Sequence, residues 1–456
     1  MKVERMPAAA GVSCGAALAH AVACILALAA ARPAGAADFA YQVDVGAGYS
    51  DNIARSSTGE QDETIGTLGL QFSLDQRTAK LTADIIGDLA YFDYLDDTFA
   101  SELTGNIAAN ARFAFVPERF EWLVADNFGQ VLSNPFAPAT PGNRENINVF
   151  TTGPDFAMRL GSQMRLRVGG RYTMTTYENR PFDSDIVSGE LALVRELSSS
   201  SELSLNGQVQ SIEYDQQALN ADYDQTQAFV RYDATGARTT LTIDVGYTEV
   251  KPDGGGDSQD GLLFRFDAAR RLSPSTTATL SAGREFANSA TAFAGIQGAN
   301  GISLESAIGL QTVQPFTNDR VAASLDFSRN RTGFTVSAGW FDQSYDNAPT
   351  LDQTLTTVAA QVRRDLSSRT SVAVRALYAQ ADFNQSGGDY DELNAGVNFV
   401  LRLSPATSLA FNYDYWDRNG NALSGDYQEN RFWLLFAFGR GAPRDTPMLP
   451  EFGIDR

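Results

Sequence analysis

The sequence predicts an all-β protein, a transmembrane antiparallel up-and-down β-barrel of about 20 strands (roughly 18 to 22) that follows a cleaved signal peptide. Three observations lead to this prediction. Apolar and polar residues alternate along most of the chain, and the connections between the alternating segments are short and long in strict turns. In addition, an apolar segment too short for a membrane helix lies close to the end of the chain.

The first 36 residues have the features of a secretory signal peptide: a charged start, an apolar core and a small-residue cleavage site, AGA, at residues 34–36. We therefore expect the chain to be exported. A lipid anchor on Cys24 is the alternative, but the apolar core continues past that residue, where a lipoprotein would turn polar. Cys14, Cys24 and His20 are the only cysteines and the only histidine, so residues 37–456 contain neither type.

The composition favours one membrane domain over several soluble ones. The 456 residues carry a formal net charge of −20, and removing residues 1–36 takes away three basic residues and one acid, which leaves −22. Such an acidic chain does not bind nucleic acid through its phosphates. No linker or composition break divides the rest of the chain, and no later apolar run reaches the length of about 18 residues that a membrane helix needs. We predict a barrel at residues 37–440 and a periplasmic tail at residues 441–456.

Alternation with a period of two, which is typical of strands with two different faces, begins near Tyr41 and recurs along the chain. The apolar faces of five such segments are Tyr41, Val43, Val45, Ala47 and Tyr49; Leu81, Ala83, Ile85, Gly87, Leu89 and Tyr91; Met164, Leu166, Val168, Tyr172 and Met174; Leu393, Ala395, Val397, Phe399 and Leu401; and Leu409, Phe411, Tyr413 and Tyr415. A soluble β-sandwich would alternate in the same way, so the connections must decide between the two folds.

The connections between these segments fall into two classes that alternate. Nine are short, such as DQRTA, VPER and LSPS, and ten are long and acidic or Gly-rich, such as SDNIARSSTGEQDE and KPDGGGDSQD. Short periplasmic turns that alternate with longer outer loops are typical of outer-membrane barrels. Nine short and ten long connections join about 20 strands and leave both barrel termini on the short-turn side.

The segment FWLLFAFG, residues 432–439, is apolar without interruption. A helix that crosses a bilayer needs about 20 residues, whereas a tilted strand needs about 9 to 11, so only a strand fits. Phe432, Leu434, Phe436 and Phe438 then share one face, which we expect to contact lipid. We predict that this segment is the closing strand and pairs with the first strand near Tyr41, so that no unpaired edge remains.

Two segments, GYSDNI at residues 48–53 and NRENINVFTTGPDF at residues 143–156, resemble the β-barrel porin type 2 group. That group includes EpsL-like proteins of exopolysaccharide loci and the barrels associated with exosortase (PEP-CTERM) systems. The resemblance covers residues 39–438. It implies an outer-membrane barrel encoded with genes for polysaccharide synthesis and export, and it supplies no catalytic residues.

Charged residues on the predicted inward faces are the candidate functional residues. We predict that eight of them line the pore: Arg165, Arg167, Arg171, Arg231, Arg265, Arg375, Asp84 and Asp88. Guanidinium groups attract carboxylates and donate hydrogen bonds to hydroxyls, so the arginines suit a path for an anionic or sugar-rich solute. The alternative is that they neutralise the acidic residues of the lumen.

Catalysis and cofactors are not expected, because residues 37–456 lack the histidine on which barrel hydrolases and acyltransferases commonly rely. Imidazole or thiolate metal sites are excluded in the same way. The long connection at residues 287–319 is predicted either to fold into the mouth or to stand above the membrane, and it is the only connection that we expect to reach across the mouth. Tyr94, Trp122, Trp340 and Trp416 are interpreted as girdles at the membrane interface.

We therefore expect a barrel in the outer membrane of a Gram-negative cell that takes part in exopolysaccharide export and passes a hydrophilic polymer through a polar lumen. A porin for small solutes and a structural or surface-interaction barrel without transport are the alternatives. The expected partners are outer-membrane lipid, the barrel assembly machinery during folding, polysaccharide and periplasmic export proteins, but no nucleic acid.

Overall fold

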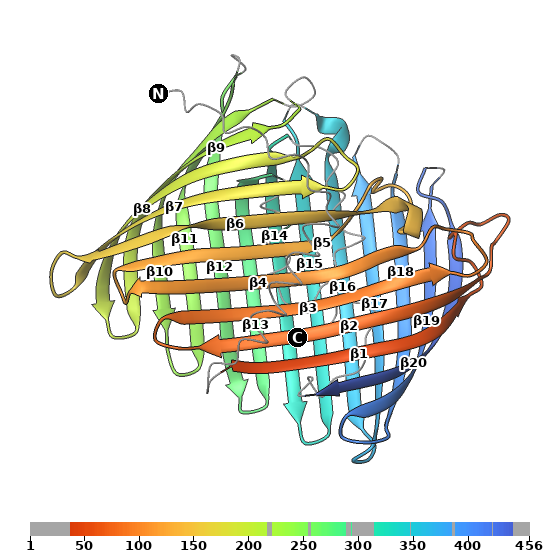
Figure 1. Cartoon of the computed structure of the whole chain (residues 1–456). Helices are drawn as coiled ribbons and strands as arrows, with labels where there is room; N and C mark the ends of the chain where they lie inside the picture. The colour runs from red at the N-terminus through yellow and green to blue at the C-terminus, as the bar shows by residue number, and fades with distance from the viewer. Residues whose placement is uncertain are drawn as a thin grey trace.

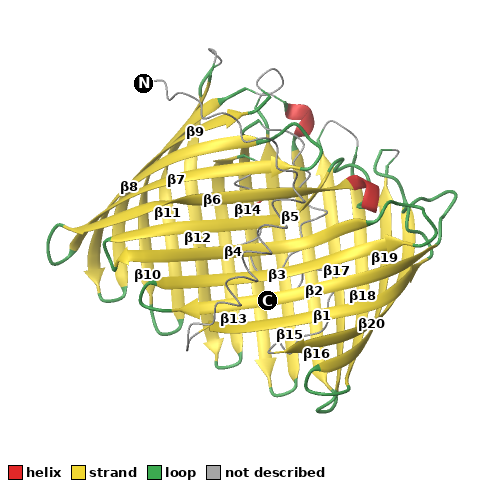
Figure 2. Ribbon diagram, in the orientation of Figure 1, coloured by secondary structure: helices red, strands yellow, loops and turns green. Residues whose placement is uncertain are grey.

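The computed structural model describes residues 37–216, 221–253, 257–288, 293, 314–346, 348–384, 388–421 and 423–440. These residues form one closed ring of 20 antiparallel strands, in which each strand pairs with its sequence neighbours and β1 pairs with β20 (Figures 1 and 2). The predicted fold is therefore confirmed. Among the described residues, no helix is long and apolar enough to cross a membrane.

The strands are 12 to 16 residues long. Their bounds are β1 Ala37–Ser50, β2 Glu63–Arg77, β3 Leu81–Tyr94, β4 Glu102–Val116, β5 Phe120–Leu132, β6 Arg144–Arg159, β7 Met164–Tyr177, β8 Ser184–Ser198, β9 Ser201–Tyr214, β10 Tyr223–Thr235, β11 Thr239–Pro252, β12 Gln259–Ser273, β13 Thr276–Ala287, β14 Phe316–Arg329, β15 Thr332–Ser344, β16 Gln353–Asp365, β17 Thr370–Phe383, β18 Tyr390–Arg402, β19 Thr407–Gly420 and β20 Tyr427–Arg440. Two short 3-10 turns, η1 Pro141–Asn143 and η3 Pro349–Leu351, lie in connections.

The connections have the alternation that the sequence predicts. Nine of them span two to four residues and gather at one end of the barrel, which we call the turn end. The other ten span six to 28 residues and gather at the opposite end, the loop end. Strand β1 begins and strand β20 ends at the turn end.

The pairing between β1 and β20 defines the two faces of the wall. Phe432, Leu434, Phe436 and Phe438 lie opposite Tyr49, Ala47, Val45 and Val43, and the four β20 side chains are 40–54% exposed. The intervening Trp433, Leu435 and Ala437 are at most 1% exposed and point into the barrel. The closing strand therefore turns its predicted lipid face outward, because side chains alternate between the two faces of a strand.

Apolar side chains cover the outward face of the other strands as well. Highly exposed examples, outward by their pairing, are Val187, Leu205, Val209, Val245 and Val374, at 50–60%. A closed ring leaves no strand edge unpaired, and its apolar outer surface suits hydrocarbon. The fold is thus a membrane-spanning barrel.

Two of the four predicted interface residues lie on the expected face. Trp122 and Trp340 point outward and are 36% and 40% exposed. The prediction is wrong for Tyr94 and Trp416, which are 4% and 8% exposed and belong to a buried cluster inside the barrel. Side chains an odd number of residues apart lie on opposite faces of a strand. Tyr94 is three residues from the outward Tyr91 and Trp416 is next to the outward Tyr415, so both face the lumen.

The seam between β1 and β20 depends on a glycine. Gly48 lies opposite Trp433, and a Cβ atom at position 48 would lie 2.4 Å from the indole Cε3 atom. The side chain of Trp433 is buried against the inner wall, so it has little room to move. A larger residue at position 48 would have to displace this indole for the first and last strands to pair.

Candidate functional site in the lumen

The strand register places all eight predicted pore-lining residues on the inward face. Arg165, Arg167 and Arg171 alternate with the outward Leu166 and Val168 on β7, and Arg231, Arg265 and Arg375 occupy inward positions on β10, β12 and β17. Asp84 and Asp88 lie opposite Asp75 and Gln71 of β2, also inside. Their role in conducting a solute remains a prediction.

Most of the arginines are held by carboxylates on neighbouring strands. Arg171 donates to both oxygens of Asp155, at 2.7 and 2.8 Å, and Arg231 donates to both oxygens of Asp244, at 2.7 Å each. The two-nitrogen pair of Arg231 fixes its guanidinium plane as well as its charge. Arg171 contacts Asp155 through Nη2 alone, and its plane is fixed by Nη1, which donates to the carbonyls of Pro154 and Gly170. The side chains of these arginines are therefore positioned by the wall.

The remaining predicted arginines differ among themselves. Arg265 lies 2.6 Å from Glu285 and 3.5 Å from Asp244, while Arg165 pairs with Glu202 and Arg375 with Asp414. In the described part of the chain, Arg167 has no carboxylate within ion-pair distance, and its side chain is exposed to the lumen. Five of the six arginines thus neutralise lumen acids, whereas Arg167 keeps an uncompensated positive charge.

A second group of charges, which no local sequence pattern indicates, lies at the loop end, and we call it the mouth cluster. It consists of Arg55, Tyr390, Glu392, Arg418, Tyr427, Glu429 and Arg431. All seven are at most 5% exposed. Full burial of so many charges is tolerated only when they are paired, so the cluster fixes the wall and the nearby loops in one arrangement.

Two carboxylates are the centres of the mouth cluster. Glu429 accepts from Arg55 Nε at 2.9 Å, from Arg431 Nη2 at 2.6 Å and from the Ser50 hydroxyl at 2.6 Å. Glu392 accepts from Arg418 Nε at 2.6 Å and from the Tyr427 hydroxyl at 3.0 Å. The two centres are therefore connected through Tyr427, which both Arg55 and Arg418 approach.

Aromatic rings cover the guanidinium groups. The Arg418 guanidinium lies 3.8 Å from the centroid of Tyr390, and that of Arg55 lies 4.4 Å from the centroid of Trp416. The Tyr427 ring lies between them, 5.4 Å from Arg55 and 5.6 Å from Arg418. Flat aromatic faces beside hydrogen-bonding cations are the chemistry that binds sugars, whose rings have apolar faces and polar edges.

Residues 133–143, which connect β5 and β6, form a lid loop across the mouth. Phe136 of this loop makes an edge contact with Phe383 at the end of β17, with ring centroids 4.7 Å apart, and strands β5 and β17 are eight strands apart around the ring. Asn143 holds the loop together by donating to the carbonyls of Asn134 and Pro138, at 2.8 and 3.0 Å.

The lid loop corrects the expectation that only residues 287–319 can reach across the mouth. Each half of the lid loop has about five residues, which reach roughly 17 Å when extended. That length is enough to meet the loops of the opposing wall. Residues 289–292 and 294–313 of the predicted constriction lie outside the described residues. Phe293 is described, and it is 4% exposed within a buried apolar cluster.

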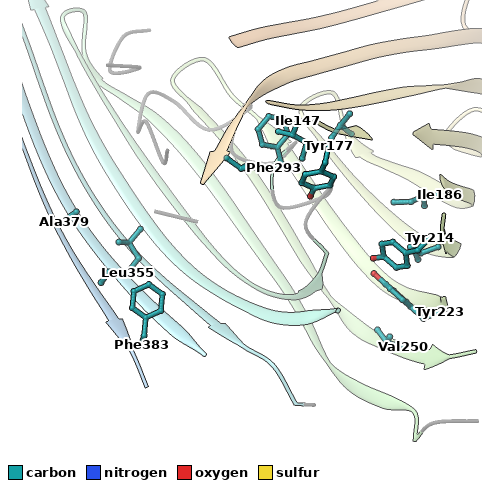
Figure 3. Close-up of a cluster of buried hydrophobic side chains, with 14 of the residues drawn as sticks. Ile147, Tyr177, Ile186, Tyr214, Tyr223, Val250, Phe293, Leu355, Ala379 and Phe383 are labelled. Atoms are coloured by element: carbon teal, nitrogen blue, oxygen red, sulfur yellow. The ribbon is translucent and has the colours of Figure 1, made fainter. Parts of the chain in front are cut away.

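That apolar cluster lies below the lid loop and is drawn in Figure 3. Leu355, Ala379 and Phe383 come from β16 and β17, while Tyr177, Tyr214 and Tyr223 come from β7, β9 and β10 on the facing wall (Figure 3). At the loop end the lumen is therefore lined by this apolar cluster and, beside β18 to β20, by the paired charges of the mouth cluster, while further paired charges lie toward the turn end.

The comparisons with known proteins add little to this geometry. No protein-family profile matches the chain, and no curated protein does, so the resemblance to exopolysaccharide-locus barrels remains a prediction. Three solved structures illustrate the remote likeness found. The unliganded ferric citrate transporter FecA has a TM-score of 0.44 at 10% identity, over 88% of this chain and 78% of its own. The ferric enterobactin receptor PfeA of Pseudomonas aeruginosa has 0.47 at 10%, over 90% and 81%. OccAB3 of Acinetobacter baumannii has 0.37 at 8%, over 89% and 99%. Likenesses this remote carry no inference about function.

Proposed function

We propose that this chain is an outer-membrane barrel that passes a hydrophilic polymer, an exopolysaccharide, through its lumen. The observation that carries the proposal is the closed ring of 20 strands with an apolar outer face and a charged inner face. Rings of this size can enclose a wider lumen than porins of about 16 to 18 strands, provided that loops do not fill it. Such a width suits a polymer.

The chemistry of the inner wall supports a sugar as the solute. Paired guanidinium and carboxylate groups such as Arg171 and Asp155 offer donors and acceptors to hydroxyls without leaving a large net field. The rings of Trp416, Tyr390 and Tyr427 near the mouth are buried beside Arg55 and Arg418, and they would offer stacking surfaces to a pyranose ring once these guanidinium groups move away. The resemblance to exopolysaccharide-locus barrels favours the same solute.

A porin for small solutes is the second candidate, because the charged half of the lumen would also admit ions and metabolites. Deletion of the gene distinguishes the two. We expect the deletion strain to lose surface polysaccharide, to regain it with a plasmid copy, and to take up small solutes at nearly the normal rate. Normal surface polysaccharide combined with poor growth on limiting small nutrients would favour the porin.

A further inference from the structure

Arg55 joins two loops to the wall of the barrel. It lies in the connection between β1 and β2, is 4% exposed, and donates through Nε to Glu429 of β20. Through Nη1 it donates to the carbonyl oxygen of Ala139 in the lid loop, at 3.0 Å. Its φ angle of 48° is left-handed, a conformation that a non-glycine residue adopts only when its surroundings enforce it. The same carbonyl oxygen also accepts from Arg144 Nη2 of β6, at 3.0 Å. Arg55 is therefore the group that links the lid loop to β20, while Arg144 links it to its own strand.

In the part of the chain that the structure describes, the contacts of the far side of the lid loop are apolar. Phe136 lies against the ring of Phe383 and beside Gly388, where a Cβ atom would approach within 2.3 Å of Phe136 Cδ1. Apolar contacts between two loops have no directional bond to break. Release of Arg55 would thus detach the lid loop from β20 and leave it tethered to β6 by Arg144.

Arg55 can leave Glu429 without leaving that carboxylate unpaired. Glu429 keeps the hydrogen bonds from Arg431 and Ser50, which together compensate its charge. In contrast, Arg55 Nη2 and both terminal nitrogens of Arg418 are buried and have no hydrogen-bond partner among the described residues. Buried donors of a charged group that lack an acceptor are costly, so an entering oxyanion would gain three donors.

We infer that the mouth cluster is a binding site for a carboxylate-bearing solute, and that capture of Arg55 by such a carboxylate releases the lid loop and opens the lumen. The carboxylate takes the place of Glu429 on Arg55 and accepts from Arg418, while the Tyr427 ring between the two guanidinium groups contacts the sugar. No covalent step is involved. The inference rests on the proposed transport function and narrows its solute to an acidic saccharide.

Single-channel recording in planar bilayers tests the inference with sodium glucuronate, sodium acetate and glucose as probes at equal concentration. We expect glucuronate to raise the open probability of the wild-type channel by about tenfold, the scale set by exchange of one charge-assisted hydrogen bond. Glucose should have no effect. An equal rise in open probability with acetate would show that a carboxylate alone is sufficient for opening. A rise with glucuronate alone would show that the site recognises the sugar and its carboxylate together.

Arg55→Gln should be open without any probe and should no longer respond to glucuronate. Arg77→Gln is the matched control, because that guanidinium is exposed at the turn end, where it pairs with Asp75 and Asp84. The shift of the folded band on unheated gels shows that each variant has formed a barrel. An Arg55→Gln channel that opens and responds like the wild type would overturn the inference, as would equal responses to glucuronate and glucose.

A cross-link gives a second, independent measurement. Residues 37–456 contain no cysteine, so Phe136→Cys with Gly388→Cys introduces a single pair across the mouth. Oxidation should close the channel even with glucuronate present, and reduction should restore it. If cross-linked channels conduct normally, the lid loop does not control the lumen. If folded channels conduct but no carboxylate changes their open probability, this inference is wrong and the proposed transport function stands. If the folded protein never conducts, with Arg55→Gln included, the proposed transport function is wrong as well.

Discussion

Arg167 differs from its neighbours on β7, because Arg165 and Arg171 are each paired with carboxylates and Arg167 has none within ion-pair distance in the described part of the chain. Each replacement of these arginines by Gln removes one positive charge from the lumen. We expect Arg167→Gln to shift the reversal potential toward cations in a salt gradient, and the triple variant to shift it further. Arg195→Gln, at an outward position of β8, is the control. An unchanged reversal potential in a conducting triple variant would assign these arginines to structure alone.

Ile85 and Asp84 are adjacent residues with opposite environments. Ile85 points outward, among apolar side chains such as Leu74 and Leu89, whereas Asp84 points into the lumen and lies 3.2 Å from Arg77. We expect Ile85→Arg to lower the free energy of unfolding by about 2–4 kcal/mol, the usual cost of a charge on the lipid face. Asp84→Arg should cost less than about 1 kcal/mol, because an exposed ion pair contributes little. Urea unfolding in lipid vesicles measures both, and equal costs would contradict the assignment of faces.

The odd or even position of a residue along its strand, which decides the face on which its side chain lies, explains which side-chain predictions are wrong. The alternation of the segment puts Tyr413 and Tyr415 on one apolar face, and the same alternation puts Trp416 on the opposite face, which lies inside the barrel. The interface interpretation used residue type instead of parity, since tryptophan and tyrosine are common at membrane interfaces. For Tyr94 and Trp416, position on the strand determines the environment more strongly than residue type does.

At the scale of elements, the strand count and the alternation of connections could be predicted because both depend on local patterns. A period of two and a turn of two to four residues are visible within about 15 neighbouring positions, which is the length of one strand. The mouth cluster could not be predicted in this way, since Arg55 and Glu429 are 374 residues apart and meet only when β1 pairs with β20. The position of the lid loop could not be predicted either, because no pattern in its 11 residues indicates which part of the wall it contacts.

The seam between β1 and β20 gives a prediction about barrel closure. Gly48→Ala should destabilise the barrel by about 1–3 kcal/mol, because the added methyl group would overlap the Trp433 indole. In a Trp433→Ala background the same change should cost much less. Gly207→Ala is the control, since a Cβ atom at position 207 meets no atom within 4 Å. Unfolding free energies of the four variants test the coupling, and equal costs of Gly48→Ala in both backgrounds would show that the Trp433 indole is not what excludes the methyl group.

At the scale of the whole molecule, charge is divided between the two surfaces of one wall. The outward surface is mostly apolar, with acids such as Asp185 and Asp391 near the loop end that accept from the outward Tyr172 and Tyr378 hydroxyls. Other acids lie inside, in part neutralised by arginines, or in the loops. Closed strand pairing makes such barrels resistant to denaturation until they are heated. We expect residues 37–456 to be recovered in the outer-membrane fraction and to change mobility on gels after heating. Recovery in the soluble periplasm, or a far-ultraviolet spectrum dominated by helix, would contradict the barrel.

Conductance of the purified protein in a planar lipid bilayer is the most direct test of a membrane barrel with a polar lumen controlled at its mouth. Residues 37–456 should insert and form ion channels that are mostly closed, with a preference for cations because the lumen keeps an excess of acids. Arg55→Gln should form the same channels with a higher open probability. Barrels that insert and show the heat-dependent mobility shift, yet conduct no ions in either form, would contradict a water-filled path through the ring.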